Sequence, residues 1–270
     1  GPYAGILIIA IAAFALRSID MEHRPVHGDE ANQAYKAGKL LETGRYVYDP
    51  HDHHGPTLYY AALIPFFLTG TNSLADADTW MVRTVPVFFG AGLIGLLALV
   101  RRELGTGSVL CTGLLLLASP AFTFYSRYFI QEVLLVFFTF AAIAFAARYM
   151  RRPGFGWAVG FGAALSLMHA TKETAVLAYG AMALAAVVVW SAYRSAGGVY
   201  SDRPVSRAGH ALAAVAVGLA LNVTLFSAFF THWRGPLDSM LTYAAYFDRA
   251  SGDHIHDQPW HYYLSLLWYM

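Results

Sequence analysis

Two polar clusters interrupt a sequence that is otherwise rich in apolar residues. The first is the pentapeptide His27–Ala31, in which Asp29 and Glu30 place two carboxyl groups side by side in the chain. The second is the octapeptide Asp49–Pro56, which contains three histidines. Both follow the apolar run Tyr3–Ile19, which is long enough to cross a bilayer. Carboxylates and imidazoles held at a membrane surface are groups that can move protons or bind polar ligands, so these clusters are the first candidates for a functional site.

The composition excludes an ordinary soluble domain. Of 270 residues, 57% are hydrophobic and 13% are charged, and the mean hydropathy is +0.45. Soluble domains carry about a quarter of charged residues. The net charge of +1 and the lack of a basic tract exclude a nucleic-acid partner. With a single cysteine, Cys111, no intramolecular disulfide can form, and metal ligation through sulfur is disfavoured.

The apolar residues come in runs of the length of membrane spans. An eighth run opens near Trp260, and a shorter run, Thr57–Leu68, is too short to be assigned by length alone. The chain starts at Gly1 and ends at Met270 within an apolar run, so we expect the natural protein to continue and its C-terminal part to be missing. The seven complete candidate spans are Tyr3–Ile19, Trp80–Val100, Leu104–Tyr125, Tyr128–Ala147, Gly154–Ala170, Thr174–Tyr193 and Ala208–Phe230.

Loop charges predict the topology. Three loops, at residues 101–103, 148–152 and 194–207, carry eight of the 18 basic residues but two of the 17 acidic ones. Basic loops stay in the cytoplasm, so residues 20–79 and 231–259 are expected to form outer loops. An odd number of spans must then separate Asp29 from Arg101, so Thr57–Leu68 is expected to lie in the outer interface. Ala31–Glu42 has helical spacing of apolar residues and predicts a second interfacial helix.

These patterns predict an all-α polytopic membrane protein. The expected architecture is a single module over residues 1–270, with seven spans, the start of an eighth, and interfacial helices in the first outer loop. The N-terminus is expected in the cytoplasm, and the polar clusters on the outer face of the plasma or inner membrane.

The adjacent acids Asp29 and Glu30 allow two interpretations. On an extended segment their side chains would point to opposite sides, so that one could face a reaction while the other anchors the loop. Alternatively, they mark an ordinary helix start, because acidic residues favour the N-terminus of a helix such as the one expected from Ala31.

Four further charged residues stand at the outer ends of spans. Glu132 follows Arg127 at the start of one span, and Lys172 precedes Glu173 between two others. Ionisable residues at membrane depth are costly and are functional candidates by default. The competing interpretations are an Arg127–Glu132 pair that fixes two helix ends, and a Lys172–Glu173 pair that leaves no cation for a lipid phosphate.

The histidines do not match a metal-binding pattern. His51, His53 and His54 lack an i, i+4 pair on a helix and a cysteine partner, so generic zinc spacing is not met. We therefore predict no metal site from this motif. Hydrogen bonds from His53 and His54 to headgroups or to a sugar are the favoured interpretation, and a transition-metal site is the alternative.

The order of these motifs resembles a known family. An Asp-Glu pair, an amphipathic helix and the run Tyr48–Tyr60 are similar to polytopic GT-C glycosyltransferases, the relatives of dolichyl-phosphate-mannose protein mannosyltransferases and of the lipid A aminoarabinose transferase. The pattern most resembles a prokaryotic branch with a His-x-Asp-Glu-Ala loop and an Asp-Pro-His-x-x-His-Gly-Pro-Thr run. Further matches are Arg83, Ser119-Pro120, Tyr125-Ser126-Arg127 and Lys172.

The resemblance implies a reaction and its reactants. It implies a polyprenyl-phosphate sugar donor, a lipid, glycan or protein acceptor, and transfer on the outer face. Asp29 would be the base and Glu30 would orient the loop. Arg127 and Lys172 would bind the phosphate, while Glu132, which stands where many relatives have Asp, would position Mg²⁺ or Mn²⁺ or bind the sugar.

The reaction chemistry agrees with these groups. A phosphodiester leaves as a weakly basic anion and needs cations rather than a general acid, whereas the acceptor hydroxyl needs a base. One base and one in-line displacement predict inversion at the anomeric carbon. Two other classes compete with a glycosyltransferase. A lipid-linked sugar flippase or transporter would place its charges near mid-bilayer, and a catalytically silent membrane scaffold would not need the clustered acids.

Overall fold

The computed structural model describes residues 1–52, 54–195, 207–251, 259, 261, 262 and 265. Within these residues, the secondary structure consists of helices, and no strand is present. The expected eighth span near Trp260 and residue His53 lie outside the described residues.

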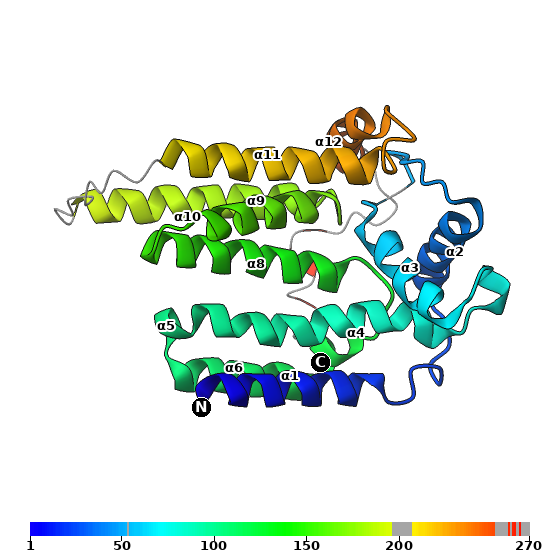
Figure 1. Cartoon of the computed structure of the whole chain (residues 1–270), viewed down its shortest axis with the longest axis horizontal. Helices are drawn as coiled ribbons and strands as arrows, with labels where there is room; N and C mark the ends of the chain where they lie inside the picture. Colours follow the sequence, from blue (N-terminus) through cyan, green and yellow to red (C-terminus); the bar gives the residue numbers. More distant parts are fainter. Residues whose placement is uncertain (53, 196–206, 252–258, 260, 263–264, 266–270) are drawn as a thin grey trace.

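Most of the helices form one bundle along a common axis (Figure 1). Within the described ranges, the helical stretches that are long and apolar enough to cross a membrane are four: Thr79–Leu104, Glu132–Arg151, Ala175–Ala192 and Ala208–Phe226. Shorter apolar helices run beside them, which confirms an all-helical polytopic membrane protein. The bundle helices are α1 (Pro2–Ser18), α4 (Thr79–Leu96), α6 (Thr106–Ala118), α8 (Glu132–Arg151), α9 (Phe155–His169), α10 (Ala175–Ser195) and α11 (Arg207–Phe226).

Two of the expected spans have internal breaks. The run Leu104–Tyr125 is divided into α6 and the short helix α7 (Pro120–Tyr125), because Ser119 is extended and caps α7 at the Phe122 N–H. After Leu96, α4 continues as a 3₁₀ turn, η2 (Leu97–Val100), and then as α5 (Arg101–Leu104).

The segment expected to form the last outer loop, residues 231–259, contains a helix that the sequence did not predict, α12 (Gly235–Ser251). This helix contacts the end of α9, where His169 Nδ1 lies 2.6 Å from the Tyr243 hydroxyl and Nε2 lies 3.2 Å from Ser239 Oγ. The location of this segment on the outer face stays a prediction.

Helices α2 (Gly28–Thr43) and α3 (Thr57–Thr69) lie together at one end of the bundle (Figure 1). The expected amphipathic helix over Ala31–Glu42 is α2, which starts three residues earlier. Gly44 caps its C-terminal end with a φ of 65°. Gly44 therefore takes a left-handed conformation that glycine adopts without strain. A 3₁₀ turn, η1 (Leu74–Asp76), connects this pair to α4.

The start of α3 is fixed to the turn between α9 and α10. The Thr57 N–H donates to the Ala170 carbonyl at 3.0 Å, and the Thr57 and Thr171 hydroxyls are 2.7 Å apart. A Cβ atom on Gly55 would lie 2.1 Å from the Ala170 carbonyl oxygen, so only glycine permits this approach. The polar run that contains His54 is thereby held over the ends of the bundle helices.

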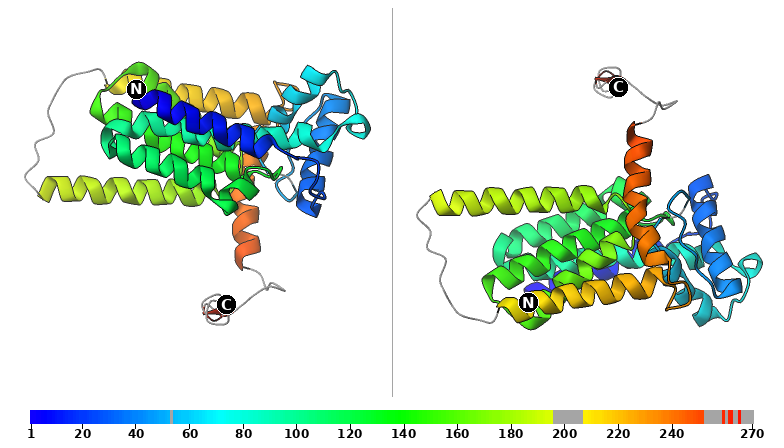
Figure 2. Two further views of the ribbon diagram at one scale, coloured as in Figure 1. Left: turned by 90° about the horizontal axis from the view of Figure 1, so that it is seen from below. Right: turned by 90° about the horizontal axis from the view of Figure 1, so that it is seen from above.

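Helix α10 stands apart from the bundle core (Figure 2). Its apolar side chains are largely exposed, among them Val187, Val188 and Trp190. Exposed apolar surface of this extent is expected of a helix that contacts lipid or further protein.

Basic residues of the first two basic loops lie at the bundle end opposite to α2 and α3. Helix α5, with Arg101 and Arg102, and the last turn of α8, with Arg148 and Arg151, both occupy this far end (Figure 1). The arrangement agrees with the predicted separation of Asp29 from Arg101. Which end faces the cytoplasm stays a prediction.

We expect cysteines at the two ends to label from opposite sides of the membrane. The variants are Asn72→Cys near α3 and Gly107→Cys near α5, both at exposed positions, in a background in which exposed Cys111 is replaced by serine. A membrane-impermeant maleimide added to intact cells should modify Cys at 72 and spare Cys at 107. Labelling of both positions from the same side would contradict the topology.

Candidate functional site

A buried ion pair between Glu30 and Arg83 links helix α2 to helix α4. Arg83 Nε donates to Glu30 Oε1 and Arg83 Nη2 donates to Glu30 Oε2, each at 2.7 Å. The exposed fractions of the two side chains are 0% for Glu30 and 1% for Arg83. The geometry is bidentate, which is the strong and directional form of a carboxylate–guanidinium contact.

The same network holds the peptide that precedes α2. Arg83 Nη1 donates to the carbonyls of Met21 and Arg24, the latter at 3.0 Å. Arg24 in turn donates through Nη2 to Glu30 Oε2 at 3.2 Å, and the Phe129 N–H donates to Glu30 Oε1 at 3.2 Å. Glu30 is thus the common acceptor for groups from three separate segments.

These contacts keep Glu30 ionised in spite of its burial. Burial by itself would raise the pKa of the Glu30 carboxyl group. This effect of burial is outweighed by the hydrogen bonds from Arg83 and from the Phe129 N–H, together with the charges of Arg83 and Arg24. The pKa of Glu30 is therefore below its ordinary value. Glu30 is therefore a buried, paired carboxylate that holds the loop, and it is not exposed to a reactant.

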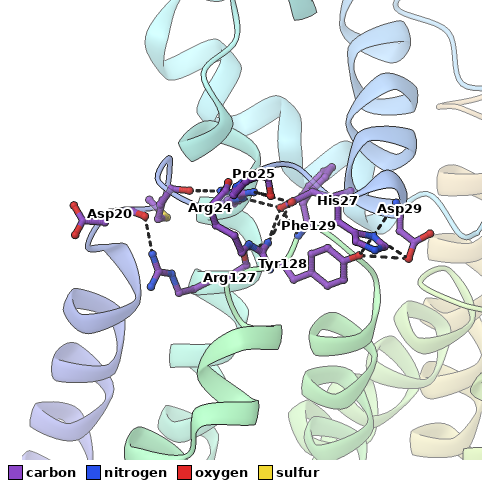
Figure 3. Close-up of polar contacts among 11 residues, drawn as sticks. Asp20, Arg24, Pro25, His27, Asp29, Arg127, Tyr128 and Phe129 are labelled. Carbon is purple, nitrogen blue, oxygen red and sulfur yellow. Dashed lines mark hydrogen bonds and ion pairs between the residues drawn. The ribbon is translucent and has the colours of Figure 1, made fainter.

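Asp29 has the opposite environment. Its side chain is 72% exposed and lies in the first turn of α2. Its carboxylate accepts a hydrogen bond from the Tyr128 hydroxyl at 3.3 Å and lies 3.5 Å from His27 Nδ1 (Figure 3). The two acids are in a helical turn and not on an extended segment, so the helix-start interpretation is confirmed. The helix nevertheless buries one acid and exposes the other.

Tyr128 connects Asp29 to His27. Its hydroxyl lies 2.6 Å from His27 Nδ1, and His27 also caps α2 by accepting from the Asp29 N–H at 3.3 Å. Burial, followed by the charge and hydrogen bond of Asp29, raises the pKa of Tyr128. The phenol consequently stays protonated near neutral pH and can donate to the carboxylate.

Glu132 and Lys172 meet at a second point on the same end of the bundle. Lys172 Nζ lies 2.6 Å from Glu132 Oε1. The Lys172 side chain is 18% exposed and the Glu132 side chain is 41% exposed. Glu132 Oε2 is buried and has no hydrogen-bond partner in the described part of the chain. The two competing pairs considered from the sequence, Arg127–Glu132 and Lys172–Glu173, are therefore not the ones formed.

His54 and Glu173 form the neighbouring pair. His54 Nδ1 lies 2.9 Å from Glu173 Oε2. Burial would raise the pKa of Glu173, but the hydrogen bond and charge of His54 bring it below its ordinary value. His54 is thus engaged with a carboxylate in this structure, and binding of a sugar by His53 and His54 stays a prediction.

Arg127 lies on the other side of the Glu30 network from Asp29 (Figure 3). Its Nη2 atom donates to the carbonyls of Ile19 and Asp20, at 2.5 and 2.8 Å, and so satisfies two carbonyls at the end of α1. The structure does not bring Arg127 into contact with Lys172 or Asp29, and the expected role of Arg127 toward a donor phosphate stays a prediction.

Sequence reasoning did not assign roles to several residues around the site. Arg83 was noticed only as a family match, although a charged residue in the first turns of a span is itself a signal. Arg24 and Tyr128 gave no signal that separates them from ordinary loop and interface residues. Gln33 was also missed, and its Oε1 accepts from Tyr59 at 2.6 Å and from Gln131 at 2.8 Å, which ties α2 to α3 and to the start of α8.

Comparison with known protein families matches the sequence to one family. A family model described as dolichyl-phosphate-mannose-protein mannosyltransferase matches residues 41–234, which is more than half of the chain. The chain belongs to this family. Membership supports a membrane glycosyltransferase that uses a polyprenyl-phosphate sugar as donor. No curated protein matches the chain.

The match covers one part of the site and not the other. Glu132 and Lys172 lie within residues 41–234, whereas Asp29 and Glu30 precede them. The likeness of the His27–Ala31 loop to a prokaryotic branch therefore stays a prediction, and the case for the two acids depends on their geometry.

We expect the substitution Glu30→Gln to destabilise the protein in a pH-dependent way. Because the pKa of Glu30 is lower in the folded state than its ordinary value of 4.5, the carboxylate stabilises the fold above about pH 4.5. This contribution is lost as the pH falls through the folded pKa. Removing one partner of a buried ion pair costs about 3–5 kcal/mol, and Gln keeps part of the hydrogen bonding, so we expect a loss of about 3 kcal/mol at neutral pH.

The measurement is thermal unfolding of purified variants in detergent at several pH values. The matched control is Glu22→Gln, an exposed acid of the same loop, which should leave the unfolding temperature unchanged. The gap between wild type and Glu30→Gln should narrow as the pH falls below about 4.5. A gap that is independent of pH would show that the charge of Glu30 does not stabilise the fold.

Proposed function

We propose that this protein transfers a sugar from a polyprenyl-phosphate donor to an acceptor hydroxyl, with Asp29 as the general base. One observation carries the proposal: of two adjacent acids, Glu30 is fully buried and paired, whereas Asp29 is 72% exposed. A base must be reachable by the group it deprotonates, and its position must be fixed by other contacts. Family membership supports the donor class, and the division between the two acids supports the choice of base.

The proposed step is a single displacement. The Asp29 carboxylate accepts the proton of the acceptor hydroxyl as that oxygen bonds to the anomeric carbon of the sugar. The bond between the anomeric carbon and the phosphate oxygen breaks, and the polyprenyl phosphate leaves with the electron pair. Attack from the side opposite to the leaving group inverts the anomeric centre. Tyr128 donates to the Asp29 carboxylate at 3.3 Å and so orients the base.

Lys172 is the proposed contact for the departing phosphate. Its ammonium group has three donors, and the bond to Glu132 uses one of them. The remaining donors can neutralise the charge that develops on the phosphate. In a site with little water, this electrostatic interaction strongly stabilises the transition state. Glu132 holds Lys172 in place, and the exposed part of its side chain is the proposed contact for the sugar. Binding of Mg²⁺ or Mn²⁺ at Glu132 is the alternative role for this carboxylate.

The surface location of these groups favours transfer over transport. Asp29 sits at the start of α2, and Glu132 and Lys172 sit at helix ends on the same side of the bundle (Figure 1). A carrier is expected to place its ionisable groups near the middle of the bilayer. We assign the reaction to the outer face, in line with the predicted topology, and a lipid, glycan or protein hydroxyl as the acceptor.

We expect Asp29→Asn to abolish most of the transfer while leaving donor binding nearly unchanged. The amide keeps the shape of the side chain but cannot take a proton, and loss of a general base lowers rates by about 10²–10⁴. The assay follows label from a radiolabelled polyprenyl-phosphate sugar into acceptor by purified protein in nanodiscs, together with donor affinity. The matched control is Asp78→Asn, an exposed acid at the start of α4 without a side-chain capping bond.

The variant Lys172→Ala separates the two halves of the site. This variant should weaken donor binding, unlike Asp29→Asn, because the cation contacts the phosphate in both the bound donor and the departing group. If Asp29→Asn retained near-normal transfer, the base would lie elsewhere. If wild type showed no transfer with any polyprenyl-phosphate sugar, a catalytically silent scaffold would be the better description.

A further inference from the structure

A cavity lies beside the Glu30 network, on the side away from Asp29. Its volume is about 700 Å³, and it opens between the ends of α1 and α6, helix α7 and the loop that follows α1. Apolar side chains form its inner walls, among them Leu16, Leu117 and Phe124, and Ala118 is also part of the lining. Arg24 and Arg127 lie at its edge (Figure 3).

Both arginines keep donors that the protein does not use. Arg24 engages Glu30 and the Arg127 carbonyl through Nη2 alone, and Arg127 engages the end of α1 through Nη2 alone. In the described part of the chain, the Nε and Nη1 atoms of both residues have no protein acceptor. The Arg24 guanidinium is also held 4.9 Å over the Phe124 ring, which keeps it at the cavity.

The charge around this cavity is positive. Arg83 lines it as well, but its charge is cancelled by Glu30. Asp20 contributes an acid to the lining, and its carboxylate points away from the two arginines (Figure 3). His23 also lies in the lining and adds no negative charge.

A buried cation follows a lining residue in the chain. Arg17 is fully buried and donates to the carbonyls of Ala13 at 3.2 Å and Leu116 at 2.8 Å, and among the described residues its Nε atom has no hydrogen-bond partner. No carboxylate forms an ion pair with it among the described residues. Its neighbour Leu16 and the residue after Leu116, Leu117, both line the cavity. An unneutralised charge at this depth is costly and favours an anion nearby.

We propose that this cavity binds the phosphate of an anionic membrane phospholipid. Arg24 and Arg127 bind the headgroup phosphate, and an acyl chain lies against Leu16 and Leu117 along α1 and α6. The apolar walls distinguish a lipid from free phosphate, because a free ion gains nothing from them. The surplus of positive charge distinguishes an anionic lipid from a zwitterionic one. The site is separate from Asp29 and Lys172 and does not depend on the proposed transfer reaction.

The test is lipid retention by the whole purified protein in native mass spectrometry. Phosphatidylglycerol and phosphatidylcholine with identical chains are added at equal concentrations. Wild type should retain phosphatidylglycerol preferentially, and excess inorganic phosphate should not displace it. Arg127→Gln should lower this retention by about tenfold, the effect of one lost charge-assisted hydrogen bond. Ala118→Trp should lower it as well by filling the cavity without changing any charge.

Two matched variants serve as controls. Arg102→Gln removes an exposed arginine at the opposite end of the bundle, and Leu115→Trp places the same indole side chain on an exposed position of α6 outside the cavity. Neither should change retention. If Arg127→Gln fails to fold because α1 loses its C-terminal contacts, the lipid retention of Ala118→Trp alone tests the proposal. Equal retention of the two lipids by wild type, displacement by inorganic phosphate, or unchanged retention in Ala118→Trp would overturn the proposal.

Discussion

The arrangement of this membrane surface depends on the bidentate contact between Glu30 and Arg83. The Arg83 guanidinium also binds the carbonyls of Met21 and Arg24. This one side chain of α4 therefore attaches both Glu30 and the segment that enters α2. A buried pair of this kind is costly to break, since the remaining partner would keep an uncompensated charge. The pair therefore fixes where α2 begins, and hence where Asp29 is presented.

The network divides this end of the protein into two sides. On one side, Tyr128 and His27 surround the exposed carboxylate of Asp29. On the other side, Arg24 and Arg127 border an apolar cavity. Arg24 connects the network to the cavity, because it binds Glu30 and also lines the cavity. Lys172 and Glu132 complete the polar surface at the ends of α8 and α9, where the proposed donor phosphate would leave.

The sequence was informative where a signal is periodic or compositional. Helical spacing of apolar residues predicted α2, and loop charge predicted that Thr57–Leu68 is not part of the long bundle. The break at Ser119 was missed because the apolar run continues through Pro120, which is well tolerated at the first position of a new helix. Helix α12 was missed because its segment is polar and lacks the length of a span.

Pairings between distant residues were harder to predict. The sequence left two interpretations of Asp29 and Glu30 open, an extended segment and a helix start, and the structure has the helix start. The partner of the buried acid, Arg83, is 53 residues away in the chain. For Lys172, nearby acids in sequence offered equally plausible partners, and only the packing of α8 against α9 selects Glu132. Charge patterns therefore indicated the chemistry at this surface, while tertiary packing determined which charges meet.

The most direct test of this account is a double-mutant cycle on transfer rate with Glu30→Gln and Asp29→Asn, measured on folded protein at equal donor saturation. If Glu30 acts only by positioning the segment that carries Asp29, Glu30→Gln should slow the wild-type enzyme. It should then have almost no further effect once Asp29 is already Asn. Independent, fully additive losses would contradict the claim that the buried acid works through its exposed neighbour.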